Sequence, residues 1–178
     1  MMLTEKRTIL LVGDVSFESA EQIILQIRSY LQENAKEDIY LIIASTGGNL
    51  FAAFSLYDFI KASGASVVTI GLGEVSSAAI MVWLAATKGG PKATENTFFA
   101  LHETTGGMNG SLKVSETETL YTHRAMRQDR YFEIMAKTTN KTFEEVKRLA
   151  CRDTLFDVDM MVKSGFLHRK DIIKTSGS

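Results

Sequence analysis

The sequence is poor in the residues that mark secreted or membrane-bound proteins. It holds one cysteine, Cys151, so no disulfide can form within the chain, which fits a protein that folds in a reducing compartment. No apolar run is long enough to span a bilayer. Residues 1–7 lack the apolar stretch of a signal peptide. We therefore expect a cytoplasmic protein that does not associate with membranes.

Excess charge of either sign is also lacking. The 20 Lys and Arg residues nearly balance the 21 Asp and Glu residues, for a formal net charge of -1. This balance gives no electrostatic footprint for nucleic acid or an anionic membrane. The three histidines and the cysteine lack metal-ligand spacing, and neither a P-loop nor a dinucleotide fingerprint is complete. The sequence thus predicts no metal and no cofactor.

Apolar strands alternate with amphipathic helices along the first hundred residues. At 178 residues, with 45% hydrophobic content and no linker, the chain suits a single domain. The predicted strands cover 8–12, 39–44, 67–70 and 97–101, and helices are expected from Ser16, from Leu50 and from the Ser76-Ser77 pair as far as Ala86. Near-continuous apolar strands with intervening helices predict an α/β fold with a mostly parallel sheet.

The second part of the chain is more polar. Residues 114–137 are too charged for a core helix and too long for a short covering helix, so they predict a protruding helix that packs on another chain. Thr142 and Glu145 form a capping box for the next helix. Asp157 is a good N-cap for a helix over 158–164, which Gly165 ends.

The stretch from Gly71 to Ile80 is the first candidate for chemistry. It predicts a strand, a tight glycine-bearing turn and a helix that begins near Ser76 or Ser77. A serine at a helix start lies beside N–H groups that have no intrahelical partner and that could stabilise an oxyanion. The commoner role of such a serine is to cap the helix. From this segment alone, both interpretations stay open.

Two more candidates follow strand ends. Gly47-Gly48 lies between a predicted strand and helix and could present N–H groups to an oxyanion, although an ordinary turn has the same pattern. His102 ends the fourth strand and could act as a general base or be an ordinary, partly buried histidine. Ligands gather beyond the carboxyl ends of parallel strands, so these elements should converge at one edge of the sheet.

Several ordered motifs resemble those of the ClpP family of self-compartmentalised serine peptidases. They are residues 38–48, like the family's strand and Ser-Pro-Gly-Gly turn; Tyr57-Asp58; Thr69-Ile70 with Gly73 and Ser77; His102 with Gly106, Gly107 and Gly110; and Arg152-Asp153 with residues 164–167. The resemblance runs from about residue 7 to residue 168. It implies a ClpP/crotonase-like βα superhelical repeat with a mostly parallel sheet and a protruding handle helix. The single domain 1–178 would then have a core over about 7–102 and 140–172 and a handle over about 103–139.

The resemblance also implies a set of site residues. Ser77 is the nucleophile, His102 the general base and Asp153 the carboxylate that orients His102. The implied oxyanion hole consists of the N–H groups of Gly48 and Ala78. Gly47, Gly106 and Gly107 would bind substrate along a strand edge. The implied activity is a serine endopeptidase that acts on peptides or unfolded polypeptides through an acyl-enzyme.

Assembly and partners follow from the same resemblance. Heptameric rings that stack as a tetradecamer would enclose the sites, with Arg152 at the ring-ring contact and an AAA+ unfoldase as partner. Because the first predicted strand begins close to Met1, we expect the family's N-terminal axial segment to be absent. Thr46, Glu103-Thr104 and Cys151 depart from the family's pattern. The alternatives are a non-catalytic ring subunit and, ranked last, a crotonase-type acyl-CoA enzyme.

Overall fold

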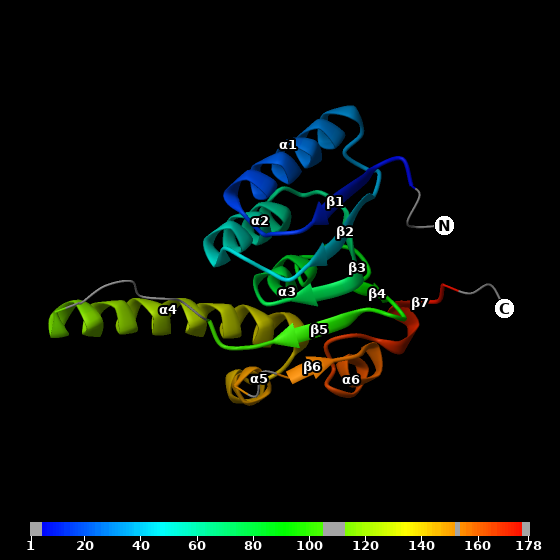
Figure 1. Cartoon of the computed structure of the whole chain (residues 1–178). Helices are drawn as coiled ribbons and strands as arrows, with labels where there is room; N and C mark the ends of the chain where they lie inside the picture. The colour runs from blue at the N-terminus through cyan, green and yellow to red at the C-terminus, as the bar shows by residue number, and fades with distance from the viewer. Residues whose placement is uncertain (1–4, 105–112, 152–153, 176–178) are drawn as a thin grey trace. The chain divides into compact units, whose positions relative to one another are not determined.

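A computed structural model describes residues 5–104, 113–151 and 154–175 (Figure 1). The chain forms two compact units, Met1–Ala100 with Leu155–Ser178 and Leu101–Thr154. Each unit has its own secondary structure. The interpretation of the chain as one domain stays a prediction.

The first unit is built on a mostly parallel sheet, as predicted. Neighbouring strands follow the order β1-β2-β3-β4-β7, and each of these pairs is parallel. β5 pairs in parallel with the second half of β3, and β6 pairs with β5. The strands are β1 (Thr8–Val12), β2 (Ile39–Ser45), β3 (Val67–Ser76), β4 (Lys92–Thr94), β5 (Phe98–Leu101), β6 (Thr154–Phe156) and β7 (Ile172–Ile173). The short strands β4, β6 and β7 were not predicted.

Capping residues start three helices of this unit, α1, α2 and α6, where the sequence indicates. α1 (Phe17–Glu33) begins after Ser16, whose side chain accepts a hydrogen bond from the Ser19 N–H. α2 (Leu50–Ala62) follows Asn49, and α6 (Val158–Lys163) follows Asp157. Between α6 and β7 lies the 3-10 helix η2 (Arg169–Asp171). Each cap satisfies N–H groups that have no partner within the helix.

The predicted turn after Ile70 is wrong, because β3 continues to Ser76. Gly71 lies opposite Ile43 of β2, whereas Val75 lies opposite Ser45, so β3 holds two extra residues at this point. Gly73 takes a φ of +70°, which a bulge in a strand tolerates well. Beyond the bulge, β3 finds new hydrogen-bonding partners in β5. The glycines thus bend a strand instead of ending it.

The third helix is shorter than predicted. It was expected to reach Ala86, but α3 spans only Ala78–Trp83. The Trp83 carbonyl accepts a hydrogen bond of 2.6 Å from the Thr69 hydroxyl, and its indole N–H donates to the Lys92 carbonyl at 2.7 Å. The Trp83 ring also packs against the Phe99 ring, with 4.8 Å between the ring centroids. These contacts bind the helix end to β3, β4 and β5.

In its described residues, the second unit contains a long helix and a short one. α4 (Val114–Thr139) covers the predicted polar segment and is exposed over its first turns, whereas Tyr131, Phe132 and Met135 near its end are buried. Asn140, in the left-handed conformation, ends it. α5 (Phe143–Ala150) begins with the predicted capping box, and Phe143 packs edge-on against Phe132.

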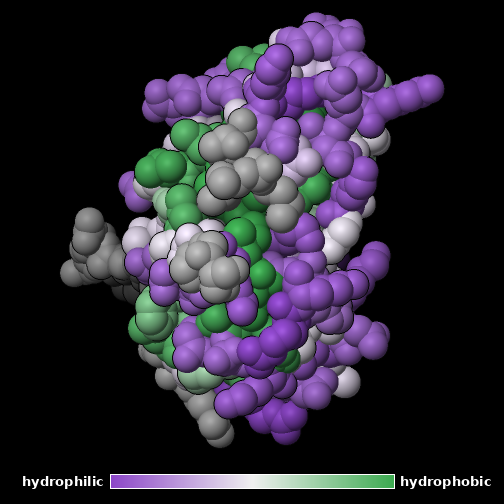
Figure 2. Space-filling view, turned by 90° about the vertical axis from the view of Figure 1, so that its right-hand side faces the viewer, coloured by the Kyte–Doolittle hydropathy of each residue, from purple (hydrophilic) through white to green (hydrophobic). Residues whose placement is uncertain are grey.

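Apolar side chains also reach the surface. β1 buries Ile9 and Leu11, whereas Leu10 and Val12 are 61% and 69% exposed, so only one face of this edge strand is covered. Figure 2 shows hydrophobic residues at the surface between hydrophilic ones on one face of the molecule. Of the helices in the described ranges, none has the length and hydrophobicity needed to cross a membrane.

Candidate active site

Ser77 is the one residue between β3 and α3, and its backbone is strained. Its φ of 54° and ψ of −128° lie outside the regions that residues with a side chain prefer. Such a conformation costs about 1–3 kcal/mol and persists only where the surroundings hold it. Here the Ser77 N–H donates a hydrogen bond of 2.9 Å to the Ala100 carbonyl. A serine in a strained strand-to-helix turn is the backbone arrangement of a nucleophile elbow.

The structure distinguishes the two neighbouring serines. Ser76 is only 3% exposed, and its hydroxyl donates to the Glu74 carboxylate at 2.8 Å and accepts from the Ala100 N–H at 3.2 Å. Ser77 is half-exposed, and in this described part of the chain its side chain makes no capping hydrogen bond to α3. The structure therefore does not support the capping role, and Ser76 serves to join β3 to β5.

Gly47 lies directly against this turn. A Cβ atom on Gly47 would be 2.6 Å from the Ser77 Cβ, 2.8 Å from the Ser76 carbonyl oxygen and 3.1 Å from the Ala78 nitrogen. Gly47 also has a φ of +105°, which residues with side chains rarely adopt. The loop after β2 and the turn after β3 thus meet without room for a side chain between them.

The N–H groups near Ser77 differ in what they already bind. The Gly47 N–H donates to the Ser45 hydroxyl at 3.1 Å. Ala78 is the first residue of α3, so its N–H has no acceptor within the helix. Among the described residues, neither the Ala78 N–H nor the Gly48 N–H donates a backbone hydrogen bond outside the helices and strands. Of these three N–H groups, only that of Gly47 is therefore already bound to a side chain of a described residue, and the oxyanion hole of Gly48 and Ala78 stays a prediction.

Ser45 was not singled out from the sequence, yet it holds this loop. Its buried hydroxyl binds the N–H two residues ahead, which is the hydrogen bond of a serine turn. A serine two residues before a glycine at a strand end is the sequence signal that could have indicated it. The loop is also tied to Val15, whose N–H donates to the Gly47 carbonyl at 2.8 Å.

His102 belongs to the second unit and follows the last residue of β5. It is half-buried, and its Nδ1 lies 2.6 Å from the carbonyl oxygen of Glu103. Because a carbonyl can only accept, Nδ1 donates in this hydrogen bond, and the neutral ring then keeps its lone pair on Nε2. This is the tautomer in which Nε2 can take a proton from a nucleophile.

The structure brings Ser77, Gly47 and Ala78 together in the first unit. Gly48 follows Gly47 in the same loop and pairs with Val15 through an isolated bridge. The remaining predicted site residues lie outside the described residues: Gly106, Gly107, Arg152 and Asp153. Their roles stay predictions. In the described ranges, no three His, Cys, Asp or Glu side chains gather as metal ligands would.

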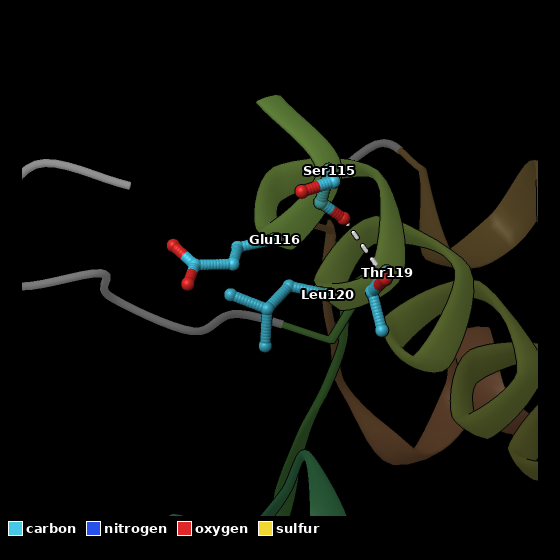
Figure 3. Close-up of a pocket in the computed structure, with 4 residues that line it drawn as sticks. All are labelled: Ser115, Glu116, Thr119 and Leu120. Carbon is cyan, nitrogen blue, oxygen red and sulfur yellow. Dashed lines mark hydrogen bonds between the residues drawn. The ribbon is translucent and has the colours of Figure 1, made fainter. Parts of the chain in front are cut away.

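A shallow pocket of about 380 Å³ lies on the first turns of α4, and the described residues that line it include none of the predicted catalytic residues. Its lining residues are Ser115, Glu116, Thr119 and Leu120 (Figure 3). The Thr119 hydroxyl donates to the Ser115 carbonyl at 2.9 Å, and the Glu116 carboxylate accepts from the Lys113 N–H at 2.9 Å. These polar groups thus take part in the structure of the helix start.

The family model and the two relatives described below all belong to the Clp proteases. The model of the Clp protease family matches residues 1–175. A relative from Leifsonia xyli subsp. xyli, called ATP-dependent Clp protease proteolytic subunit 1, is 31% identical over 166 residues, which are 93% of this chain and 83% of the relative. A relative of the same name from Rhodopirellula baltica is 26% identical over 166 residues, 93% of this chain and 72% of the relative.

Proposed function

Because the chain belongs to the Clp protease family, we propose that it is a serine endopeptidase that hydrolyses short peptides and unfolded polypeptides. The observation that carries this proposal is the strained backbone of Ser77 at the start of α3, with Gly47 packed against it. Strain of this kind needs a reason, and the presentation of a nucleophile at a strand-to-helix turn is a well-attested one.

In the proposed mechanism, the Ser77 hydroxyl oxygen attacks the scissile carbonyl carbon while the His102 Nε2 takes the hydroxyl proton. The carbonyl oxygen becomes an oxyanion, which the N–H groups of Gly48 and Ala78 stabilise. The C–N bond then breaks, and His102 returns the proton to the leaving amine. Water, deprotonated by His102, hydrolyses the resulting ester and releases Ser77.

Chain connectivity supports the pairing of Ser77 with His102. The Ser77 N–H is bound to the Ala100 carbonyl, and His102 is only two residues further along the chain. Two residues span at most about 7 Å. In the proposal, the Asp153 carboxylate shares the His102 Nδ1–H with the Glu103 carbonyl and so orients the ring, and Asp153→Asn should lower kcat by orders of magnitude while leaving the fold intact.

The proposed substrate is an extended chain. Gly106 and Gly107 would offer main-chain groups to which a peptide adds as a further strand, whereas the Gly47 N–H is already bound to the Ser45 hydroxyl and Gly47 would only leave room for the peptide. Rings of this chain, with α4 as a handle and Arg152 at the ring-ring contact, would exclude folded proteins from the sites. An AAA+ unfoldase is the proposed partner for folded substrates. The exposed first turns of α4 support a contact with another chain, because a polar helix gains little stability alone.

Labelling with a fluorophosphonate probe tests the proposal. The probe phosphonylates an activated serine, so the purified chain should gain one adduct, which peptide mass spectrometry should place on Ser77. Ser77→Ala should abolish labelling and peptide hydrolysis. Ser76→Ala should keep most of both, because Ser76 has a structural role. A wild-type chain that is folded, unlabelled and inactive would refute the proposal and favour a non-catalytic ring subunit.

A further inference from the structure

Gln128 of α4 holds the segment that follows His102. The Gln128 Oε1 accepts two hydrogen bonds from Thr104, one from its N–H at 2.9 Å and one from its hydroxyl at 3.1 Å. The Gln128 Nε2 donates to the Glu103 carboxylate at 3.2 Å. One side chain therefore binds two successive residues: Thr104 through its main-chain N–H and its hydroxyl, and Glu103 through its carboxylate.

These contacts extend to the His102 ring. Glu103 accepts a hydrogen bond from His102 Nδ1 at its carbonyl oxygen, while its carboxylate is bound by Gln128. The same carboxylate oxygen accepts a weaker hydrogen bond from the Cys151 thiol at 3.4 Å. The position of the Glu103 carbonyl, and with it the preferred orientation and tautomer of the imidazole, thus depends on side chains from α4 and from the end of α5.

The amide of Gln128 suits this place better than other side chains of its size. Its carbonyl faces two donors and its NH₂ faces a carboxylate, so only one orientation of the amide satisfies all partners. A methionine would bind none of them. A glutamate could still accept from Thr104, but its charge would repel the Glu103 carboxylate.

We propose that Gln128 is a positioning residue for the general base, and that it acts through Glu103 and Thr104 on the His102 ring. This inference rests on the proposed function of His102. Thr104 contributes both donors of this arrangement, its N–H and its hydroxyl, and a proline in its place would have no N–H to donate. The handle helix would then influence catalysis from within its own chain.

Steady-state kinetics on a fluorogenic peptide test this role. Gln128→Met should lower kcat by roughly tenfold, because it removes the hydrogen bonds that fix the segment after His102, and KM should change by less than about twofold. Gln128→Glu should lower kcat at least as much. Asp129→Asn, at the next and exposed position of α4, is the matched control and should keep the wild-type kcat. Wild-type kcat in Gln128→Met would overturn the proposal.

An exchange of the two side chains separates positioning from general damage to the helix. In the double variant Gln128→Glu with Glu103→Gln, the carboxylate at position 128 accepts from Thr104 and from the amide introduced at position 103. The hydrogen bonds are thereby restored with donor and acceptor exchanged. We expect kcat to recover to within about threefold of wild type. A double variant no more active than Gln128→Glu alone would contradict the inference.

An NMR measurement distinguishes failure of this inference from failure of the proposed function. With ¹⁵N-labelled histidine and the His102 signals assigned from His102→Gln, the wild-type ring should show a protonated Nδ1. Gln128→Met should shift the ring toward the other tautomer. Unchanged ¹⁵N shifts would refute the positioning role even in an active enzyme. Conversely, a wild-type chain that neither cleaves peptides nor reacts with fluorophosphonate would refute the proposed function, while the tautomer shift would still report on Gln128.

Discussion

Gly47→Ala is the substitution for which the structure makes the sharpest prediction. The new methyl group would lie 2.6 Å from the Ser77 Cβ, whereas ordinary van der Waals contacts begin near 3.4 Å. It would also lie 2.8 Å from the Ser76 carbonyl oxygen and 3.1 Å from the Ala78 nitrogen. Two of these three neighbours are main-chain atoms, so they cannot swing aside as a flexible side chain would.

We expect Gly47→Ala to lower both the catalytic rate and the stability of the fold. Relief of the closest contact requires Ser77 and Gly47 to separate by about 0.8 Å, the difference between 3.4 and 2.6 Å. A misplacement near 1 Å in an active site costs about 100-fold in rate. The positive φ adds strain of about 1–2 kcal/mol, and overpacking adds about 1–3 kcal/mol. Since domains are stable by about 5–15 kcal/mol, the variant should stay folded at 25 °C.

Gly64→Ala is the matched control. Gly64 has a φ of +73°, and a Cβ there would meet nothing within 4 Å. It precedes the start of β3, whereas Ser77 follows its end, and ten residues of strand extend roughly 30 Å. We expect this variant to lose about 1–2 kcal/mol of stability, a fall in Tm of roughly 2–8 °C, with unchanged activity.

The assay combines kcat/KM on a fluorogenic peptide with urea unfolding of both variants. Gly47→Ala should lose about 100-fold in kcat/KM while remaining folded, and Gly64→Ala should lose only stability. Equal losses of activity in the two variants, or full activity in Gly47→Ala, would refute the packing of Gly47 against the candidate nucleophile.

Three further predictions concern stability. Asn49→Ala should cost about 1 kcal/mol in urea unfolding, because the Asn49 side chain accepts from two N–H groups at the start of α2; no change would contradict its capping role. Lys92→Met should cost about 3–5 kcal/mol, because it leaves the carboxylate of buried Asp171 without its ion-pair partner, and a cost below about 1 kcal/mol would refute that pairing. The third concerns acid stability. The Asp38 pKa is lowered below its ordinary 3.8, first by the hydrogen bond from Lys88 and then by that from the Ser66 hydroxyl. A lowered folded-state pKa adds stability that is present above the unfolded pKa and is lost as pH falls through the folded pKa. Ser66→Ala should therefore lose less stability than wild type between pH 5 and pH 2 in urea titrations, and an equal or larger loss would contradict this account.

Features that depend on a few consecutive residues were predictable. The capping serine before α1 and the Thr142-Glu145 box before α5 act within a single turn, so the sequence alone indicates where these helices begin. The apolar runs of β1 and β2 likewise predicted a parallel sheet, because strands buried on such a sheet are apolar along most of their length.

Features that depend on partners distant in the sequence could not be predicted. The strands β4 and β7 are only three and two residues long, and they exist because each pairs with a neighbour already in the sheet. The predicted turn at Gly71 became a bulge because β5, more than twenty residues later, supplies hydrogen bonds that keep β3 extended. Local propensity gives no information about such partners.

In the candidate site, too, some features depend on neighbouring residues and others on residues distant in the sequence. The sequence by itself determined which residues are candidates for the chemistry: a serine after a strand, a glycine pair and a histidine at a strand end. Only the tertiary structure showed that Ser76 is buried and hydrogen-bonded, and only the tertiary structure imposed the strained backbone of Ser77. That conformation is unfavourable locally, and contacts with Ala100 and Gly47, which are distant in the sequence, maintain it. A strained residue cannot be predicted from local preference, because its surroundings hold it against that preference.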